Sequence, residues 1–174
     1  MFGDDKVKEL NAKQCNLFLF CCKKQFNFHS IRNFVFINHQ NMNYFLVKSE
    51  PATYAWQQFV KDGKTMWEGV RNFAARKNLR SMKMGDLVLF YHSGEDKAVM
   101  GIAKVSKEFY QDTTTKEDWS VVDLVPVKPF KKAVTLSEIK KEKMLQDIYL
   151  VRQGRLSVMP LEKKEFELIV KMGS

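Results

Sequence analysis

Apolar and polar residues follow a regular pattern only in the later part of the chain. From residue 44 onward, short apolar segments rich in β-branched and aromatic residues are bounded by turn residues. Such segments predict β-strands that are at least half buried. The expected strands are residues 44–47, 87–91, 99–105 and 119–127, with two shorter ones at residues 148–151 and 156–159.

Helices are predicted between these strands by capping residues and apolar spacing. Thr53 is a candidate cap for a short helix with Trp56, Phe59 and Val60 on one side, which should end at residues 62–63. Further helices are expected at residues 72–82, after the capping box of residues 135–138, and at residues 162–170, just after Pro160.

The order of these elements predicts the fold class. Strands predominate at short spacing, and the chain lacks the alternating βα rhythm of a doubly wound fold. We therefore expect an α+β fold, with a mixed, strongly curved antiparallel sheet or small barrel flanked by helices. No glycine-rich phosphate loop is present, so a nucleotide cofactor is not expected.

Residues 1–41 have a different composition, with many Phe, Asn and Lys residues and no sustained period. We expect them to be an atypical N-terminal extension, with Met42 as the physiological start and residues 42–174 as the domain. The alternative is a genuine extension whose phenylalanine side chains pack on that domain.

Charge and cysteine content narrow the classes of partner. The net charge of +9 favours nucleic acid first and an acidic membrane surface second, although a solvated basic surface would give the same count. All three cysteines lie within residues 1–22, and only His92 among the histidines lies beyond residue 41. The longest apolar run, residues 17–22, is too short to span a membrane. We expect a cytoplasmic protein, nuclear if eukaryotic, without metal, cofactor or membrane partner, as a monomer or weak dimer.

Three polar and aromatic segments lie at junctions where a strand ends or a helix begins: residues 48–51, 67–72 and 91–93. Trp67 offers a large aromatic face and Arg71 a fork of hydrogen-bond donors, which suits the binding of a flat heterocycle. The alternative for Trp67 is a core tryptophan. An acid–base pair of Glu50 and His92 would instead indicate an enzyme, but no nucleophile is marked. Glu50 could equally accept from Arg71 or from backbone amides.

Six segments in order resemble the EVE domain family: residues 44–51, 67–76, 79–86, 90–93, 119–123 and 155–160. The resemblance implies a PUA-like fold, a curved antiparallel β pseudo-barrel flanked by helices, similar to YTH domains, which read a modified base in an aromatic pocket. It also implies one set of ligand-binding residues: Lys48, Ser49, Glu50, Trp67, Val70, Arg71, Asn72, Tyr91, His92, Ser93, Leu156 and Ser157. The predicted contacts to the nucleic-acid backbone are Arg76, Arg80 and Arg155.

Three departures from the family pattern affect specificity. Glu68 stands where an Asp is usual, Phe73 replaces a Tyr, and the segment between Tyr110 and Trp119 is short. The prediction is a non-enzymatic reader of a modified nucleobase, a 5-substituted cytosine in DNA, with Trp67 stacking on the base. The alternatives are a PUA-like RNA-binding protein and a small nuclease or base-processing enzyme that uses Glu50 and His92.

Overall fold

In the computed structural model, which describes residues 42–174, six strands form one mixed sheet in the order β2-β5-β4-β3-β1-β6. The strands are β1 (Tyr44–Ser49), β2 (Thr65–Trp67), β3 (Leu87–His92), β4 (Ala98–Gln111), β5 (Ser120–Thr135) and β6 (Val158–Leu161). The helices are α2 (Trp56–Asp62), α3 (Phe73–Ser81), α4 (Leu136–Lys141), α5 (Tyr149–Arg152) and α6 (Lys163–Met172), with the short 3₁₀ turn η2 (Lys143–Leu145).

Strand β1 lies between β3, to which it runs parallel, and β6, to which it runs antiparallel. Its central residues Phe45, Leu46 and Val47 are all buried, as expected for an apolar run with neighbours on both sides. The parallel register pairs Ser49 with His92, so the polar ends of β1 and β3 lie at the same edge of the sheet.

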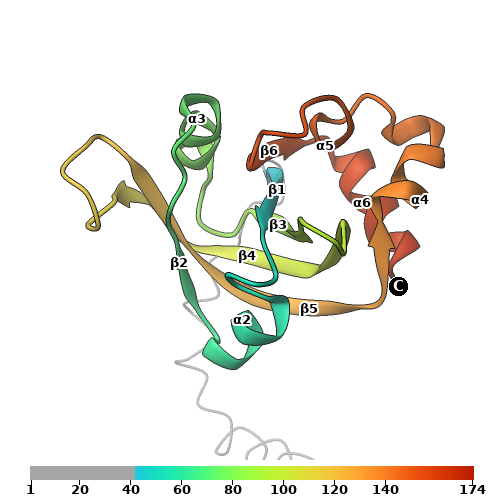
Figure 1. Cartoon of the computed structure of the whole chain (residues 1–174), viewed down its shortest axis with the longest axis horizontal. Helices are drawn as coiled ribbons and strands as arrows, with labels where there is room; N and C mark the ends of the chain where they lie inside the picture. Colours follow the sequence, from blue (N-terminus) through green and yellow to red (C-terminus); the bar gives the residue numbers. More distant parts are fainter. Residues whose placement is uncertain (1–41) are drawn as a thin grey trace, which may run out of the picture. The chain divides into compact units, whose positions relative to one another are not determined.

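Strands β4 and β5 form a long antiparallel ribbon that curves through the whole domain (Figure 1). Their pairing is interrupted by four register shifts, the first between Val99 and Gly101. Such irregularities increase local twist and bend a sheet, which explains the curvature. The predicted mixed and strongly curved sheet is confirmed.

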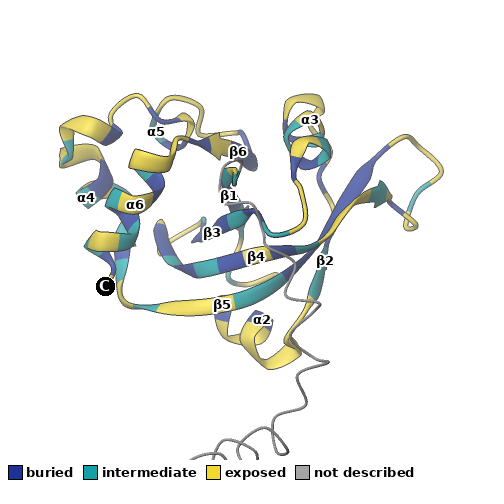
Figure 2. Ribbon diagram, turned by 180° about the vertical axis from the view of Figure 1, so that it is seen from behind, coloured by how far each residue is buried: buried dark blue, intermediate teal, exposed yellow. Residues whose placement is uncertain are grey.

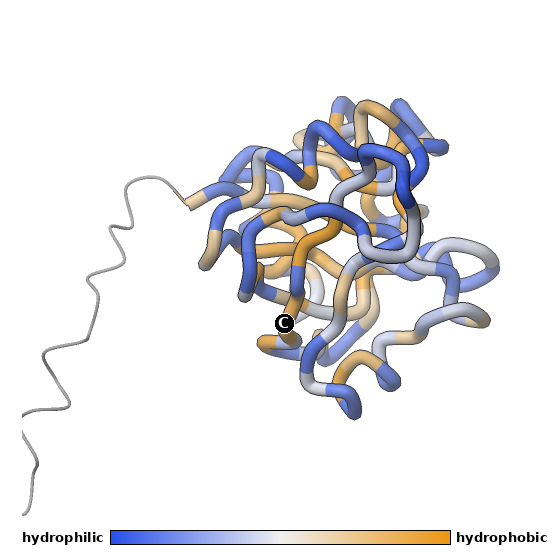
Figure 3. Tube along the Cα trace, turned by 90° about the vertical axis from the view of Figure 1, so that its left-hand side faces the viewer, coloured by the Kyte–Doolittle hydropathy of each residue, from blue (hydrophilic) through white to orange (hydrophobic). Residues whose placement is uncertain are grey.

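The helices lie around this ribbon in separate groups. Helix α3 stands at one side, α4, α5 and α6 gather at the other, and α2 lies below β5 in the view of Figure 1. Buried residues line the inner faces of strands and helices, whereas the outer turns are exposed (Figure 2). The hydropathy of the chain follows the same division, with apolar segments towards the middle (Figure 3).

An aromatic cluster packs α2 against the sheet and links the strands β2 and β3. Phe90 of β3 stacks on Phe59 at 5.4 Å between ring centroids and meets the edges of Trp56 and Trp67 at 5.3 and 5.5 Å. Trp56 reaches the sheet because Gly101 lacks a side chain: a Cβ added there would lie 2.5 Å from the indole Cζ2. The cluster fixes the place of Trp67.

Several predicted boundaries are correct because their signals are local. Gly63 ends α2 with φ +69°, and Asn72 caps α3 by accepting from the Ala75 amide at 3.0 Å. The capping box of Thr135 and Glu138 opens α4.

Other predictions are wrong. Residues 148–151 were expected as a strand, but Tyr149–Arg152 is a helix, because a run this short does not distinguish helix from strand. Ala55, not Thr53, is the N-cap of α2, and Val60 is exposed. The strand predicted at residues 156–159 is shifted to Val158–Leu161, so that Pro160, which still precedes the final helix, lies within the edge strand β6, where a missing amide donor is tolerated.

Two earlier expectations concern other parts of the chain. The extension at residues 1–41 lies outside the described residues, and the structure does not test whether Met42 is the physiological start, so both stay predictions. Within residues 42–174, no helix combines the length and apolar character needed to cross a membrane.

Candidate functional site

A cavity of about 460 Å³ lies where β1 and β2 end, and we call it the β1–β2 cavity. The structure brings together six of the predicted ligand-binding residues in its lining: Lys48, Ser49, Glu50, Trp67, Val70 and Ser157. It adds six that the sequence reasoning missed: Thr53, Tyr54, Thr65, Met66, Glu68 and Gly69. Their positions in the sequence could have identified them, because four flank Trp67 and the other two follow Pro51 within three residues.

The first wall is a tight turn at the end of β1. The Glu50 carbonyl accepts from the amides of Thr53 and Tyr54, both at 2.9 Å. The Ser49 hydroxyl donates to the Tyr54 carbonyl at 2.6 Å, and the Ser93 hydroxyl donates to the Ser49 carbonyl at 3.1 Å. These bonds hold the turn rigidly, and Ser93 acts from outside the lining.

Trp67 lies in the second wall, but its ring is less open than expected. It pairs with Val122 in the sheet, packs edge-on against Phe90, and is only 7% exposed. After it, Gly69 adopts φ +74°, which a residue with a side chain rarely adopts, and the chain turns to place Val70 in the same wall. The interpretation as an open stacking face is therefore wrong in degree: most of the ring is core, and only a small part remains for the cavity.

Lys48 places a positive charge at the cavity. Its Nζ donates to the Gly154 carbonyl at 2.9 Å and lies 5.8 Å from the centre of the Tyr91 ring. Burial lowers the pKa of the Lys48 ammonium below its ordinary 10.5, because a partly desolvated charge is disfavoured. A carbonyl compensates that charge less than a carboxylate does, so an anionic or electron-rich guest would be attracted here.

Buried His92 supports the fold from outside the lining. Its Nε2 accepts from the first amide of α2, that of Trp56, at 2.9 Å, and its Nδ1 lies 2.8 Å from the Asp96 carboxylate. Both ring nitrogens thus have partners, which leaves neither free for proton transfer to a guest. Leu156 and Tyr91 are also buried outside the lining, so for these three residues ligand contact stays a prediction.

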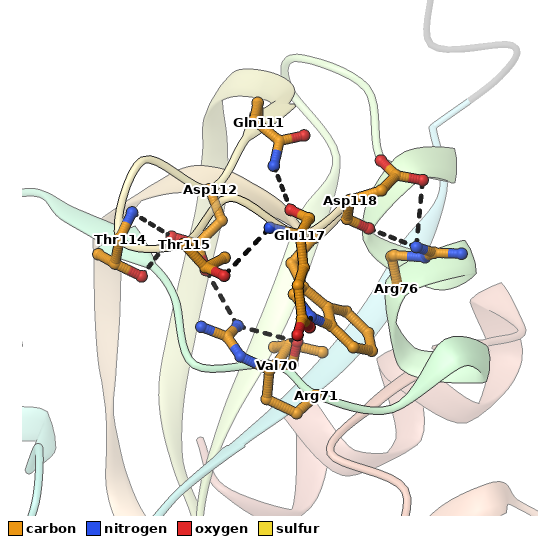
Figure 4. Close-up of polar contacts among 10 residues, drawn as sticks. Val70, Arg71, Arg76, Gln111, Asp112, Thr114, Thr115, Glu117 and Asp118 are labelled. Atoms are coloured by element: carbon orange, nitrogen blue, oxygen red, sulfur yellow. Dashed lines mark hydrogen bonds and ion pairs between the residues drawn. The ribbon is translucent and has the colours of Figure 1, made fainter.

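Arg71 follows the cavity wall in the chain and belongs to a second network of polar contacts (Figure 4), whereas Asn72 caps α3. Arg71 pairs with Asp112 at 3.0 Å, and not with Glu50 as one interpretation supposed. The fully buried Asp112 carboxylate also accepts from the hydroxyl and amide of Thr114 at 2.6 and 2.9 Å. Burial alone raises the pKa of Asp112, but the bonds from Thr114 and Arg71 outweigh it, and the pKa lies below its ordinary 3.8.

The three arginines predicted to contact the nucleic-acid backbone have different surroundings. Arg76 pairs with Asp118 (Figure 4), and Arg80 pairs with the same carboxylate, which tethers the loop after β4 to α3. Arg155 is exposed on the loop that precedes Ser157. Pairing with Asp118 offsets part of the positive charge of the first two.

The described residues offer little for metal chemistry. Within residues 42–174, no group of three or more His, Cys, Asp or Glu side chains could hold a metal ion.

Comparison with known proteins identifies relatives of this chain. Residues 43–172 match the model of the EVE domain. Thymocyte nuclear protein 1 of Gallus gallus is 36% identical over 132 residues, which cover 62% of this chain and 54% of that protein. The chain thus spans about half the length of this curated relative.

Solved structures extend the comparison. The chain is similar to Rpa0253 from Rhodopseudomonas palustris, with 41% identity, a TM-score of 0.73, and coverage of 76% of this chain and 93% of that one. It is also similar to human THYN1 protein in complex with 5-methylcytosine containing DNA, with 29% identity, a TM-score of 0.70, and coverage of 76% and 98%.

A more distant structure bears on the fold alone. The YTH domain of Zygosaccharomyces rouxii MRB1, in complex with N6-methyladenosine RNA, is 16% identical with a TM-score of 0.53, over 78% of this chain and 88% of that one. The predicted α+β, PUA-like fold is confirmed.

Proposed function

Because this chain belongs to the EVE domain family, we propose that it binds nucleic acid and holds a modified nucleobase, a 5-substituted cytosine of DNA, in the β1–β2 cavity. It does so as a reader, without breaking a covalent bond. A complex of human THYN1 protein, a 29% identical structure, with 5-methylcytosine containing DNA supports the choice of base.

The observation that carries this proposal is the composition of the cavity. Met66, Val70 and the small exposed part of Trp67 give one wall an apolar surface, and Ser49 and Ser157 bring hydroxyl groups. The volume of about 460 Å³ lies within the range of roughly 300–1,000 Å³ that small-molecule sites occupy. A pyrimidine needs this combination, a flat apolar contact for its faces and a few polar groups for its edge.

Electrostatics supports a polyanionic partner. Lys48 brings its half-buried charge to the cavity, and the whole chain carries a net charge of +9. Extruding a base from a duplex costs a few kcal/mol. Phosphate contacts supply much of the affinity in such complexes, so binding should weaken steeply between roughly 50 and 200 mM salt.

The assignment as a reader is supported by the hydrogen bonds of His92. A general base must reach the guest with a free nitrogen, and both nitrogens of His92 have partners within the protein. Substituting His92 would remove the partner of an α2 amide, so Glu50→Gln is the cleaner test of the enzyme alternative. We expect no cleaved or altered base with either wild type or Glu50→Gln.

The decisive experiment fills the cavity. Thr53 lines it but is exposed and contributes only a backbone bond to the turn, so Thr53→Trp should block the site and leave the fold intact. The matched control is Asp147→Trp, which places the same ring in a separate hollow lined by residues of α5 and α6. Asp147 is 90% exposed, and losing its carboxylate should not weaken binding to DNA.

Affinity would be measured by fluorescence anisotropy on duplex DNA with 5-methylcytosine or cytosine at one position, and on RNA of the same sequence. We expect wild type and Asp147→Trp to favour the methylated duplex, and Thr53→Trp to lose at least about tenfold, or ~1.4 kcal/mol. Equal affinity of Thr53→Trp and wild type would refute the cavity assignment. Preference for RNA would instead support the RNA-binding alternative.

A further inference from the structure

Phe73 exposes most of its aromatic side chain to solvent. It is 71% exposed, the highest value among the large apolar side chains of residues 42–174. It is the first residue of α3, whose buried residues are Ala75 and Leu79. A Phe side chain left in water forgoes about 1.5–3 kcal/mol of burial, so its position calls for an explanation beyond the packing of α3.

The ring is fixed in place by its neighbours. It stacks on Trp119 with 5.4 Å between centroids and 32° between planes. The Arg76 guanidinium lies 5.0 Å from the centre of the Phe73 ring and 5.3 Å from that of the Trp119 ring. The Arg71 guanidinium lies 5.6 Å from the centre of the Trp119 ring. We call Phe73, Trp119, Arg71 and Arg76 the Phe73 cluster.

The supports of this cluster are themselves bonded. Arg71 is paired with buried Asp112, Arg76 with Asp118, and the Trp119 Nε1 donates to Glu117 at 2.6 Å. A ring supported in this way loses little conformational freedom when it contacts a partner. The short loop between β4 and β5, one of the departures from the family pattern, is thus the base on which Phe73 rests.

The cluster lies beside the β1–β2 cavity. Phe73 follows Val70 of the cavity wall by three residues, so the two Cα atoms are at most about 11 Å apart. The guanidinium groups of Arg71 and Arg76 lie beside the aromatic rings of the cluster, and each is paired with an aspartate, Asp112 or Asp118. An exposed ring, held by its neighbours beside a base-sized cavity, matches the gap that a duplex presents when one of its bases has been extruded.

We propose that Phe73 inserts into the base stack of duplex DNA, at the step vacated by the base that enters the β1–β2 cavity. This inference rests on the proposed function and adds a second contact to it. Extrusion leaves unstacked neighbours, and apolar side chains that fill such steps are a general device of proteins that distort DNA. Stacking of one base on an aromatic ring contributes about 1–3 kcal/mol by alanine substitution.

The test compares Phe73→Ala with two matched variants. Phe73→Tyr keeps the ring, and Tyr149→Ala removes an exposed aromatic side chain from α5, outside both the cavity lining and the Phe73 cluster. Each is titrated with a duplex and with a single strand that carry the same 5-methylcytosine. The duplex carries 2-aminopurine, paired with thymine, next to the modified base, so that the guanine opposite 5-methylcytosine is kept; the fluorescence of 2-aminopurine rises when it becomes unstacked.

We expect Phe73→Ala to weaken duplex binding about 5- to 150-fold, to leave single-strand binding unchanged and to lower the 2-aminopurine response. Phe73→Tyr and Tyr149→Ala should bind both probes as wild type does. Equal loss on duplex and single strand would show a general stacking contact and overturn the insertion, and so would unchanged duplex binding.

The outcome is separable from that of the proposed function. If Thr53→Trp loses binding while Phe73→Ala does not, the cavity assignment stands and the insertion falls. If Thr53→Trp binds as wild type does, the proposed function fails, and the insertion that depends on it fails too. A thermal melt of each variant shows whether it is folded.

Discussion

Trp67 and Phe73 are two aromatic residues only six positions apart, and the structure treats them in opposite ways. Trp67 is 7% exposed and Phe73 is 71% exposed. The larger ring became part of the core, and the smaller one was left exposed to water. Ring size therefore does not predict which aromatic residue meets a partner.

The physical reason lies in the elements that carry them. Trp67 belongs to β2, which pairs with β5, and its ring faces Phe90 in the aromatic cluster. Phe73 occupies the first turn of α3, whose buried side is formed by Ala75 and Leu79. One ring helps to build the cavity and the other stands beside it, and the predictions below test this division.

The largest effect is expected at Trp67. Trp67→Ala should lower the free energy of unfolding by about 3–5 kcal/mol, because a large side chain is removed from the core. Urea unfolding followed by circular dichroism would measure it, with Phe73→Ala as the control, expected within about 0.5 kcal/mol of wild type. A similar small change in both variants would contradict the contrast. Loss of DNA binding by Trp67→Ala alone is uninformative for the same reason.

Asp112, which holds the Phe73 cluster through Arg71, should show the next effect. Asp112→Asn removes a buried charge that accepts three hydrogen bonds, and we expect a loss of about 1–3 kcal/mol. Asp147→Asn, at an exposed carboxylate paired with Arg152, is the control and should change stability by less than about 0.5 kcal/mol. Equal effects of the two substitutions would show that the loop needs no such support.

The same carboxylate predicts a response to acid. The pKa of Asp112 is lower in the folded chain than its ordinary 3.8, so the stabilisation it provides is fully present above that pH and is lost as the pH falls through the folded-state pKa. Wild type should lose more stability than Asp112→Asn between roughly pH 5 and pH 3. Urea unfolding at a series of pH values would measure it, and parallel curves would contradict it.

Lys48 should show the smallest change in stability together with a change in binding. Lys48→Met removes a partly desolvated charge and keeps an apolar stem, so we expect the free energy of unfolding to change by no more than about 1 kcal/mol, in either direction. Affinity for DNA should fall, and the slope of log affinity against log salt should decrease by about 0.9 if Lys48 contacts a phosphate. Lys163→Met, on α6, is the matched control, and an equal effect of both would contradict a special role for Lys48.

Local signals in the sequence determined much of this domain. Gly63, Asn72 and the capping box at Thr135 set helix ends, because each acts on backbone groups only a few residues away. Apolar segments likewise identified β1, which carries the cavity residues Lys48 and Ser49, and its parallel neighbour β3. The segment at residues 148–151 failed because it was too short to carry a period.

The ordered segments also led to the family, and so to six of the twelve residues that line the cavity. What they could not give was the exposure of each side chain. Burial of Trp67 depends on Phe90, and the fixing of Phe73 depends on Trp119 and on the Arg71–Asp112 pair, whose members are 41 positions apart.

The amino-acid sequence by itself determined most of the elements and the fold class, because these depend on backbone preferences and on apolar spacing between near neighbours. Only the tertiary structure decided which aromatic ring is covered, which arginine is paired and which polar side chains share one wall. Those outcomes depend on contacts between distant segments, which a linear pattern does not specify.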